Sequence, residues 1–439
     1  MNRVNEDFRV KYRHGMMKRW AVWLMTGVCL CLLSGCAHSI TIGGQSYDPD
    51  TTAVSITDVT FRDYAQLKKL PKLSQLDLTA LPLSPEEYEN IVSQVGEGVV
   101  IRWNVPLGGT RYPDTTEALH LSEGDLPQAV GVLPYFNRLQ SVAIDDSELS
   151  EDLCRVIETV REKNPDADIQ CRCRFLGREI DNATEKLNLN DTTVSDPDDI
   201  RRVVRAFPRI QTLEMCNCGL SDEQMGQLRE DFPDVTFIWI IRFDRFAVRT
   251  DVKVFSTLGY KKYYDVTEET FRPLFLYCTE LRALDIGHHN VKDISDITHL
   301  KKLQVLILTD NAIEDISPLA ELPALCYAEL INNQIEDASP LTRLEQIEDV
   351  NLSYNPDLKN ASELVKCKNL KRLCIYNSNL TSGEINTLKE HLPGKCRFIY
   401  TAFDATHEKR KRIKQAFFQW ESVEEFDYNS EELFTLKRR

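Results

Sequence analysis

The sequence lacks the surplus of basic residues that nucleic-acid binding requires. Its 439 residues include 53 Lys and Arg against 68 Asp and Glu, a net charge of −15. Proteins that bind nucleic acid draw most of their sequence-independent affinity from clustered Lys and Arg, so chromatin and RNA roles are excluded and no nucleic-acid partner is expected. The 42% hydrophobic content is too high for wholesale disorder, and the length favours several domains or an extended repeat array.

Catalytic motifs are also missing. The eight histidines form no HExxH, and neither GxSxG nor GxxxxGK[ST] is present. The acidic residues follow no glycosidase pattern, and the distances between their carboxylates cannot be read from the sequence. We therefore expect a protein that is not an enzyme and has no cofactor, with an envelope hydrolase as the least favoured alternative.

The 13 cysteines are too sparse for a disulfide-built miniature fold, and the odd number argues against complete internal pairing. Two pairs, Cys171-x-Cys173 and Cys216-x-Cys218, would each present two thiols on one face of a strand. Zinc sites usually use wider spacing, so packed thiols are favoured over a metal or redox site. Ten thiols after Cys36 in an exported protein suggest a weakly oxidising habitat. The pair His288-His289, near Asp285, lacks further ligands, and no metal is expected there.

The amino terminus has the pattern of an export signal. Six basic residues in the first 19 positions precede a 14-residue apolar run at positions 20–33, whereas a bilayer span needs about 20 apolar residues. Leu33-Ser34-Gly35-Cys36 resembles the lipobox of bacterial lipoproteins. That resemblance implies a signal peptide at 1–35, a diacylglycerol on Cys36 and an extracytoplasmic protein held to a bacterial membrane by its amino-terminal lipid. An ordinary secretory signal is the alternative.

Processing would make the chain more acidic. Loss of residues 1–35 removes six basic and two acidic groups and leaves 47 against 66, a net charge of −19. Such a charge would repel anionic headgroups and keep the body of the protein away from the membrane surface. We interpret residues 36–50, with Gly43-Gly44, as the lipidated cysteine and a short tether.

A strict repeat begins at Leu281. Leu281, Leu303, Leu325 and Ile347 start units at 22-residue steps, and Leu370 follows after 23. Each unit fits LxxLxLxxNxIxDIxPLxxL, a leucine-rich repeat in which LxL forms a short parallel strand and the rest returns the chain. Asn311, Asn333 and Asn355 recur at 22-residue intervals, where their amides would bond the backbone at the end of each strand.

The 22-residue units resemble those of bacterial internalins through the signature NxIxDIxPL, over about residues 281–367. The resemblance implies a leucine-rich repeat fold and a binding role. There are only four or five regular units and no LPxTG motif at the carboxyl end, so the resemblance does not extend to invasion or to a host receptor.

Residues 51–280 contain a longer repeat of about 68 residues. The stretch IQTLEMCNCGLSDEQ from Ile210 repeats LQSVAIDDSELSEDL from Leu139, and the modules start near positions 51, 115, 182 and 250. One third of 68 is about 22.7, close to one leucine-rich turn, so each module should contribute three strands. The first module's strands are expected at 54–56, 73–78 and 100–105. Segments 84–95 and 221–232 have helical spacing and begin with Ser, a helix N-cap signal.

The predicted fold class is therefore α/β: a single leucine-rich repeat solenoid over residues 51–400, with parallel strands on the concave face and helices or irregular turns on the convex face. Residues 106–116 contain Gly108-Gly109 and could instead form a hairpin. Residues 401–439 are expected to form a cap and tail, with a helix over 407–419, that covers the last exposed repeat. The basic run at 408–414 is expected to be a solvated face of that cap.

Side chains beside the strand leucines should project from the concave face. The candidate partner-binding residues are Asp285, Val305, Ile307, Tyr327, Glu329, Ile331, Asp349, Asn351, Arg372 and Tyr376. Exposed apolar and aromatic groups surrounded by charge are typical of an interface, and Tyr is a common hot-spot residue. If so, Tyr327→Ala would leave melting nearly unchanged and weaken partner binding by about 1 to 3 kcal/mol. The alternative is that the cap or a loop covers these side chains.

These patterns predict a non-catalytic, lipid-anchored cell-surface protein that binds a protein ligand of unknown identity through its concave face. The second hypothesis is a carbohydrate or wall-polymer binder that stacks sugars on Trp103, Tyr112, Trp239 and the concave tyrosines. Competition by soluble glycans or by proteins would separate these two hypotheses.

Overall fold

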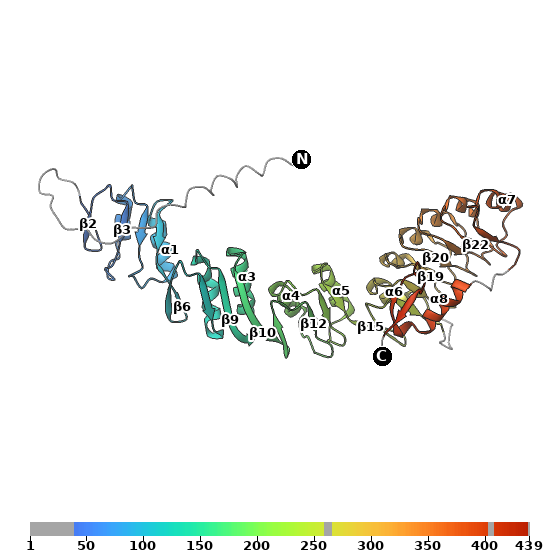
Figure 1. Cartoon of the computed structure of the whole chain (residues 1–439), viewed down its shortest axis with the longest axis horizontal. Coiled ribbons are helices and arrows are strands. Elements are labelled where there is room, and N and C mark those ends of the chain that lie inside the picture. The colour runs from blue at the N-terminus through green and yellow to red at the C-terminus, as the bar shows by residue number, and fades with distance from the viewer. Residues whose placement is uncertain (1–38, 259–265, 403–407, 438–439) are drawn as a thin grey trace. The chain divides into compact units, whose positions relative to one another are not determined.

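The computed structural model describes residues 39–258, 266–402 and 408–437 (Figure 1). It divides into two compact units, the first ending at Asn104 and the second beginning at Val105. The predicted signal peptide and Cys36 lie outside the described residues. No helix within the described ranges is long and apolar enough to cross a bilayer.

The first unit contains one three-stranded parallel sheet, of β3 (Ala53–Ser55), β4 (Gln75–Asp77) and β5 (Val100–Arg102). These strands occupy the positions predicted for the first module. The unit also contains η1 (Tyr64–Lys69) and α1 (Pro85–Gln94). Residues 40–47, predicted as part of a tether, instead form a hairpin of β1 (Ile40–Ile42) and β2 (Gln45–Tyr47). Ile42 is buried, and this apolar anchor explains why the tether prediction was wrong there.

Three strands per module are also present in the second unit. In the next module β8 (Ala118–Leu121), β9 (Ser141–Glu148) and β10 (Asp168–Phe175) run parallel. The module after it contributes β12 (Lys186–Asn188), β13 (Thr212–Glu214) and β14 (Thr236–Ile238). The helices of these two modules are α2 (Leu126–Val132), α3 (Glu151–Lys163), α4 (Pro197–Ala206) and α5 (Asp222–Asp231), with short turns η2 (Glu123–Asp125) and η3 (Leu133–Tyr135).

Antiparallel hairpins interrupt the parallel strands. They pair β6 (Asn104–Leu107) with β7 (Thr110–Pro113), β10 with β11 (Arg178–Asp181), and β15 (Ile240–Phe243) with β16 (Phe246–Arg249). The hairpin alternative at 106–116 is confirmed, and the hairpins β10–β11 and β15–β16 are further excursions that the sequence did not predict. The turns need left-handed backbone, which glycine adopts readily: φ is +75° at Gly109 and +76° at Gly177.

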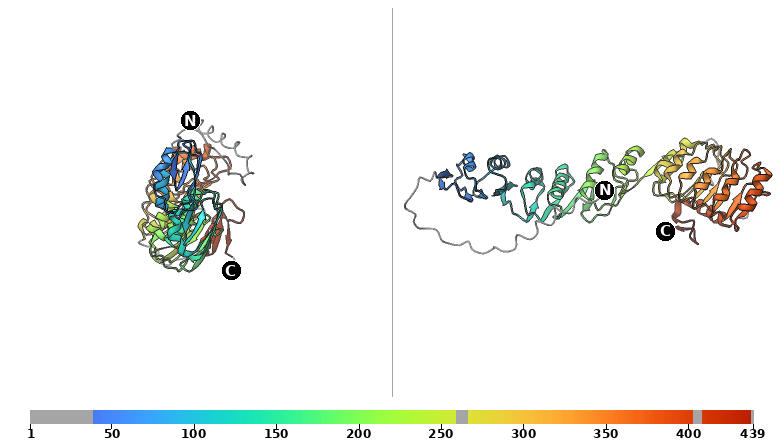
Figure 2. Two further views of the ribbon diagram at one scale, coloured as in Figure 1. Left: turned by 90° about the vertical axis from the view of Figure 1, so that its left-hand side faces the viewer. Right: turned by 90° about the horizontal axis from the view of Figure 1, so that it is seen from above.

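The regular repeats form a seven-stranded parallel sheet. Its strands follow chain order: β17 (Val254–Ser256), β18 (Ala283–Asp285), β19 (Val305–Ile307), β20 (Tyr327–Glu329), β21 (Asp349–Asn351), β22 (Arg372–Cys374) and β23 (Arg397–Ile399). Figure 2 shows the turns of this region side by side. Leu306, Leu308 and Ile316 are at most 1% exposed, so the predicted shared apolar interior is confirmed.

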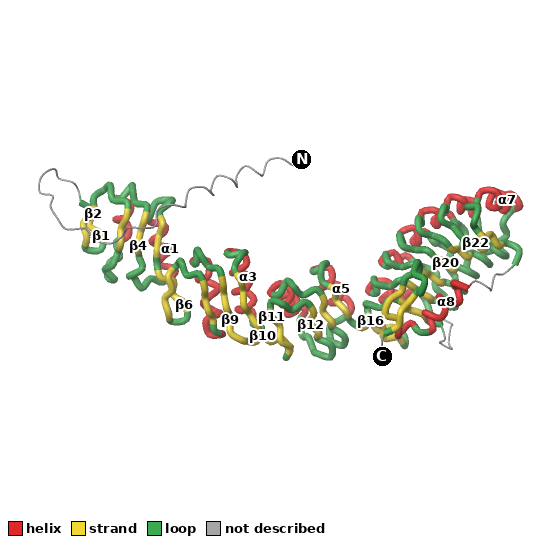
Figure 3. The backbone as a smooth tube through the Cα atoms, in the orientation of Figure 1, coloured by secondary structure: helices red, strands yellow, loops and turns green. Residues whose placement is uncertain are grey.

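Short helices return the chain between these strands, and Figure 3 shows them on the opposite side from the strands. They are α6 (Glu268–Tyr277), η4 (Ser295–His299), η5 (Ser317–Glu321), η6 (Ser339–Arg343), η7 (Ala361–Lys366) and α7 (Ser382–His391). Pro at the first turn of η5 and η6 fits because its fixed φ suits a helix start and the missing N–H has no partner there. The DIxPL part of the repeat therefore encodes the return.

The repeated asparagines bond the backbone as predicted. Asn333 donates to the carbonyls of Leu308 and Leu330 at 2.9 and 3.2 Å and accepts the Ile313 N–H at 3.1 Å. Asn311 and Asn355 make equivalent bonds one repeat away on either side. Each buried amide thus satisfies backbone groups of neighbouring turns, which would otherwise cost about 1 to 3 kcal/mol each.

Serine caps start the two predicted outer helices. Ser84 accepts the Glu87 N–H at 3.2 Å, and Ser221 accepts the Gln224 N–H at the same distance. In both cases the third helical residue bonds back to the cap, which completes a capping box. The helices α1 and α5 therefore begin where the sequence predicted.

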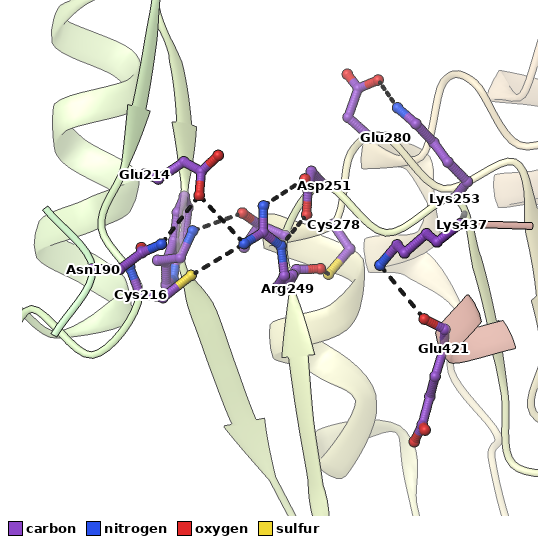
Figure 4. A network of polar contacts seen from close by, with 12 residues as sticks. Asn190, Glu214, Cys216, Arg249, Asp251, Lys253, Cys278, Glu280, Glu421 and Lys437 are labelled. Atoms are coloured by element: carbon purple, nitrogen blue, oxygen red, sulfur yellow. Dashed lines mark hydrogen bonds and ion pairs between the residues drawn. The ribbon is translucent and has the colours of Figure 1, made fainter. Parts of the chain in front are cut away.

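Arg249 joins the module of β12–β14 to the chain entering the seven-stranded sheet (Figure 4). Its Nε and Nη2 donate to the two carboxylate oxygens of Asp251, each at 3.0 Å. Its Nη1 lies 3.6 Å from Glu214 on β13 and 3.8 Å from the Cys216 sulfur. The side-chain bond to Asp251 is the main reason that the pKa of Arg249 is raised, so this contact favours the charged guanidinium.

The C-terminal segment, defined here as residues 408–437, contains α8 (Glu408–Phe418), η8 (Trp420–Ser422), β24 (Val423–Phe426) and β25 (Phe434–Leu436). The helix confirms the prediction for 407–419 over its described part. The segment was predicted to cover the last repeat. Instead it packs against the strand side of the sheet, where α8 and η8 contact β17. Figure 3 shows α8 on that side.

Candidate functional site on the strand face

The outward side chains of β17–β23 form two columns, which we call the strand face. The strands align at one repeat per step, with Val305 beside Tyr327 and Tyr327 beside Asp349. Because side chains alternate, the central residue of each strand points inward and its two neighbours point outward. The first column is Val254, Ala283, Val305, Tyr327, Asp349, Arg372 and Arg397, and the second is Ser256, Asp285, Ile307, Glu329, Asn351, Cys374 and Ile399.

An apolar cluster joins the strand face to the C-terminal segment. From the face it includes Val254, Ala283, Val305, Ile307 and Tyr327, and from the segment Ile413, Ala416, Phe417, Val423, Phe426, Tyr428 and Leu433. The helical residues lie three and four positions apart, so one face of α8 supplies them. Each large apolar side chain buried here contributes about 1.5 to 3 kcal/mol. The segment is thus held as firmly as an ordinary core element.

A charged pair lies beside this cluster. Arg410 Nε donates to both carboxylate oxygens of Glu329, at 3.1 and 2.7 Å, and its Nη2 makes a further contact. The Tyr327 hydroxyl donates to the same carboxylate at 2.7 Å. Burial would raise the pKa of Glu329, but the bonds and charge of Arg410 outweigh burial and lower it. Glu329 is therefore an ionised group that the C-terminal segment neutralises.

Backbone bonds hold the second half of the segment. Gln304 Oε1 accepts the Tyr428 N–H at 2.8 Å, and Arg282 Nη1 donates to the Phe426 carbonyl at 3.1 Å. Gln304 and Arg282 precede the strands β19 and β18. Since a buried backbone group without a partner is costly, these bonds specify the position of the chain around β24.

Two further carboxyls on the strand face have unusual proton affinities. Burial raises the pKa of Asp349 to about 6, although the guanidinium of its partner Arg372 opposes the shift. Burial also raises the pKa of Asp285 to about 6, against a hydrogen bond of 3.1 Å from the Gly287 N–H. Both carboxyls therefore keep a proton to higher pH than an exposed carboxyl does.

The structure buries nine of the ten predicted binding residues, with exposures of 6% or less; Tyr376 alone is half-buried. Their predicted exposure was wrong for Asp285, Val305, Ile307, Tyr327, Glu329, Ile331, Asp349, Asn351 and Arg372. For Val305, Ile307, Tyr327 and Glu329 the alternative, that the cap covers them, is confirmed. Tyr327 is 0% exposed, so Tyr327→Ala would create a cavity. We therefore expect this substitution to lower the melting temperature, and not to leave it nearly unchanged.

The sequence analysis missed Lys409, Arg410 and Tyr428 as groups that meet the strand face. The basic run was interpreted as solvated, which is correct for the exposed Lys411 and Arg412 and wrong for Arg410 and Lys409. Lys409 Nζ lies 3.3 Å from the centroid of the Tyr428 ring. The signal that could have found them is the apolar spacing of Ile413, Ala416 and Phe417, at and just after the end of the run, which gives the helix a buried side.

The other candidate sites do not assemble. His288 Nδ1 lies 2.6 Å from Asp310, whereas His289 Nε2 lies 3.0 Å from the Thr257 hydroxyl, so the two imidazoles face different partners. Among the described residues, no three His, Cys, Asp or Glu side chains are grouped to hold a metal ion. The four cysteines of the Cys171 and Cys216 pairs form no disulfide and are buried, as packed thiols would be. Burial raises the pKa of Cys218, and a side-chain hydrogen bond with Cys171, together with burial, raises that of Cys173.

The sugar-stacking hypothesis is affected by the burial of its tryptophans. Trp103 is 1% exposed and stacks on Tyr88 with ring centroids 4.1 Å apart. Trp239 is 3% exposed, and its Nε1 donates to Asp222 at 2.8 Å. Of the three residues proposed outside the strand face, only Tyr112 is partly accessible.

No protein-family model matches the chain, and no curated protein matches it in sequence. Solved structures with similarity include internalin C2 of Listeria monocytogenes, at 19% identity and a TM-score of 0.26, which covers 55% of this chain and 74% of that one. Another internalin of Listeria monocytogenes has 14% identity and a TM-score of 0.27, over 82% and 84% of the two chains. A leucine-rich repeat protein of Leptospira interrogans has 14% identity and a TM-score of 0.25, over 76% and 74%.

The leucine-rich repeat assignment rests on the chain itself. The 22-residue register, the asparagine bonds and the continuous parallel sheet of residues 254–399 are all present. The region is a leucine-rich repeat solenoid, and its two faces differ as in any such stack: strands on one side and short helices on the other.

Proposed function

We propose that this chain is a non-catalytic, lipid-anchored protein of the bacterial cell surface that binds a protein partner through the strand face of its regular repeats. The observation that carries the proposal is that this face already holds a polypeptide. It accommodates the C-terminal segment through an apolar cluster, a bidentate Arg–Glu pair and backbone bonds, which are the kinds of contact found in protein interfaces.

Part of the strand face lies beyond the apolar cluster. At the β21–β23 end, Ile399 is half-buried and Arg397 is exposed. Tyr376, which lies two residues after β22, is also half-buried. Tyr354 is also half-buried, and its ring meets that of Tyr376 edge to face with centroids 5.5 Å apart. Tyr and Arg are favoured hot-spot residues, so this is the end at which we place the partner.

Crosslinking pull-down from intact cells tests the proposal. Tyr376→Ala should weaken capture of the partner by about 1 to 3 kcal/mol, or roughly 5- to 150-fold in affinity, with little loss of melting temperature. Tyr112→Ala is the matched control, because Tyr112 is equally half-buried but lies on β7 outside the sheet. Equal capture by wild type and Tyr376→Ala would refute binding through this end of the face.

The same two variants test the glycan alternative. If soluble glycans compete with the ligand and Tyr112→Ala loses binding while Tyr376→Ala keeps it, the protein is a carbohydrate binder. Competition by proteins with the reverse pattern supports the proposal.

Lipid anchoring is tested separately. Cys36→Ala should abolish metabolic labelling by a fatty acid and move the protein from the detergent phase to the aqueous phase, because the anchor is the only acylated group proposed. Cys31→Ala, which changes a cysteine within the signal, is the control. Unchanged partition of Cys36→Ala would mean that the signal is an ordinary secretory one.

A further inference from the structure

A small pocket lies where the C-terminal segment meets the carboxyl-terminal end of the sheet. Its volume is about 190 Å³. The sheet side contributes Glu348, Asp349, Lys371, Arg372 and Arg397, and the segment contributes Lys409 and Tyr428. The pocket is therefore built from two parts of the chain that are separated in sequence and joined only by folding.

The pocket is cationic although the protein is acidic. Four of its lining residues are basic and two are acidic, in a chain whose net charge is −15. Both carboxylates already pair within the sheet: Lys371 Nζ lies 2.6 Å from Glu348, and Arg372 pairs with Asp349. Local charges dominate at contact distance because charges beyond about 8 Å are screened at physiological salt. Among the residues that line the pocket, the basic groups outnumber the acidic ones by two.

Docking of the C-terminal segment creates this charge balance. Arg410 neutralises the buried Glu329 on β20. Lys409, the residue before Arg410 on α8, lines the pocket. Lys409 lies over the Tyr428 ring, and Tyr428 is fixed by its backbone bond to Gln304. Without the segment the same face would keep the uncompensated charge of Glu329 and lose one cationic wall.

We propose that this pocket binds one oxyanion group, a carboxylate or a phosphate, and that the C-terminal segment is a structural part of the site. Arg and Lys arranged around a space of this size match such groups, since guanidinium donates two parallel bonds to a carboxylate or phosphate and ammonium supplies a point charge. The proposal does not depend on the proposed function: an acidic side chain of a protein and a free anion offer the same chemistry.

Equilibrium binding to the full mature protein tests it with two probes. One arm uses a labelled tetraglutamate peptide, with tetraglutamine as the uncharged probe, and the other uses inorganic phosphate in competition with it. Lys409→Gln and Arg397→Gln, which remove a charge from opposite walls, should each weaken binding about tenfold or more. Lys411→Gln is the matched control, because it removes the same charge from the exposed side of α8, where Lys411 lies 2.5 Å from Glu408.

The outcomes are distinct. Binding of either probe that falls in both pocket variants and not in Lys411→Gln supports the site, and the arm that binds identifies a peptide or a free anion as the source. Absence of binding to both probes, or equal losses in Lys409→Gln and Lys411→Gln, overturns it. Because Arg397 is exposed on β23, its variant keeps the test decisive even if Lys409→Gln disturbs the segment.

Arg410 tests whether the segment positions the site. Arg410→Gln lies outside the pocket lining, yet it should weaken probe binding and increase proteolysis within residues 408–437, because Glu329 loses its partner. Arg410→Lys keeps the charge and should restore part of the binding. If Arg410→Gln makes the segment protease-sensitive while probe affinity is unchanged, the segment is no part of the site.

Discussion

The two repeat regions of the second unit solve the same packing problem in different ways. In residues 254–399 each strand pairs directly with the strand of the next turn, so that seven strands form one sheet. In the earlier modules the third strand leads into an antiparallel hairpin, and each parallel sheet stops at three strands. Asparagines in three successive turns, Asn311, Asn333 and Asn355, accompany the continuous sheet. In the module of β12–β14, Asn190 makes one comparable bond, with its Oδ1 accepting the Cys216 N–H at 2.8 Å.

A period of about 22 residues is therefore sufficient to form parallel strands, but it is not sufficient to join them into one continuous sheet. Both regions place apolar residues at the LxL positions, and both bury them: Leu213 and Leu306 are each 0% exposed. Continuity also needs a return segment that leaves the next strand in register. The DIxPL turn provides that return, whereas a hairpin with left-handed residues at its tip redirects the chain.

A buried charge should have the largest effect on stability, and it should unfold the two regions differently. Leu306→Asp buries an unpaired charge in the seven-stranded sheet and should cost about 3 to 5 kcal/mol, unfolding several turns together. Leu213→Asp is equally buried but should open its own three-stranded module first. Hydrogen exchange measured by mass spectrometry distinguishes these outcomes. Loss of protection confined to one turn in Leu306→Asp would contradict cooperative stacking.

Tyr327→Ala should have the next largest effect. The side chain is fully buried between β20 and the C-terminal segment, so its removal should cost about 3 to 5 kcal/mol and loosen residues 408–437. Urea unfolding together with limited proteolysis measures both. Tyr376→Ala, two residues after β22 and half-buried, should cost clearly less. Equal costs would mean that the segment does not depend on Tyr327.

Substitution of the asparagines should have a smaller effect on stability, and the effect should differ between the two regions. Asn333→Ala leaves the buried Leu308 and Leu330 carbonyls without their donor and should lower the free energy of unfolding by about 1 to 3 kcal/mol. Asn190→Ala removes an isolated, half-buried amide and should cost about 1 kcal/mol or less. Thermal melting of both variants decides whether the repeated bonds matter more than the single one.

The smallest effect concerns pH. Asp285 has a folded pKa of about 6, above its unfolded value of about 3.9, so the folded state binds more protons between these values. The contribution of this group to the free energy of unfolding therefore falls as pH rises from about 4 through 6. Asp285→Asn should reduce that loss, measured as the difference between urea midpoints at pH 5 and pH 7.5. An unchanged difference would show that Asp285 does not titrate in this range.

The sequence alone predicted the strands, the asparagine bonds and the capped helices, because these depend on residues within one or two turns. Leu303 to Leu325 is one repeat, and the Asn333 partners lie within 25 residues. It could not predict that residues 40–47 form a hairpin, because Ile40 and Ile42 give no strand signal beyond a three-residue alternation. Eight of the ten candidate residues lie on the strand face, and Ile331 and Tyr376 lie two residues beyond β20 and β22. The predicted exposure of nine of them was wrong.

What occupies that face was decided by contacts between distant parts of the chain. Arg410 and Glu329 are 81 residues apart, and Tyr428 and Gln304 are 124 apart. Local propensity carries no information about such pairs, since a helix with a basic side and an apolar side can pack at either end of a solenoid or against its strands. The sequence by itself determined the repeating turn and the composition of both partners; the tertiary structure decided that they meet, because only the docked arrangement buries the apolar side of α8 and neutralises Glu329 together.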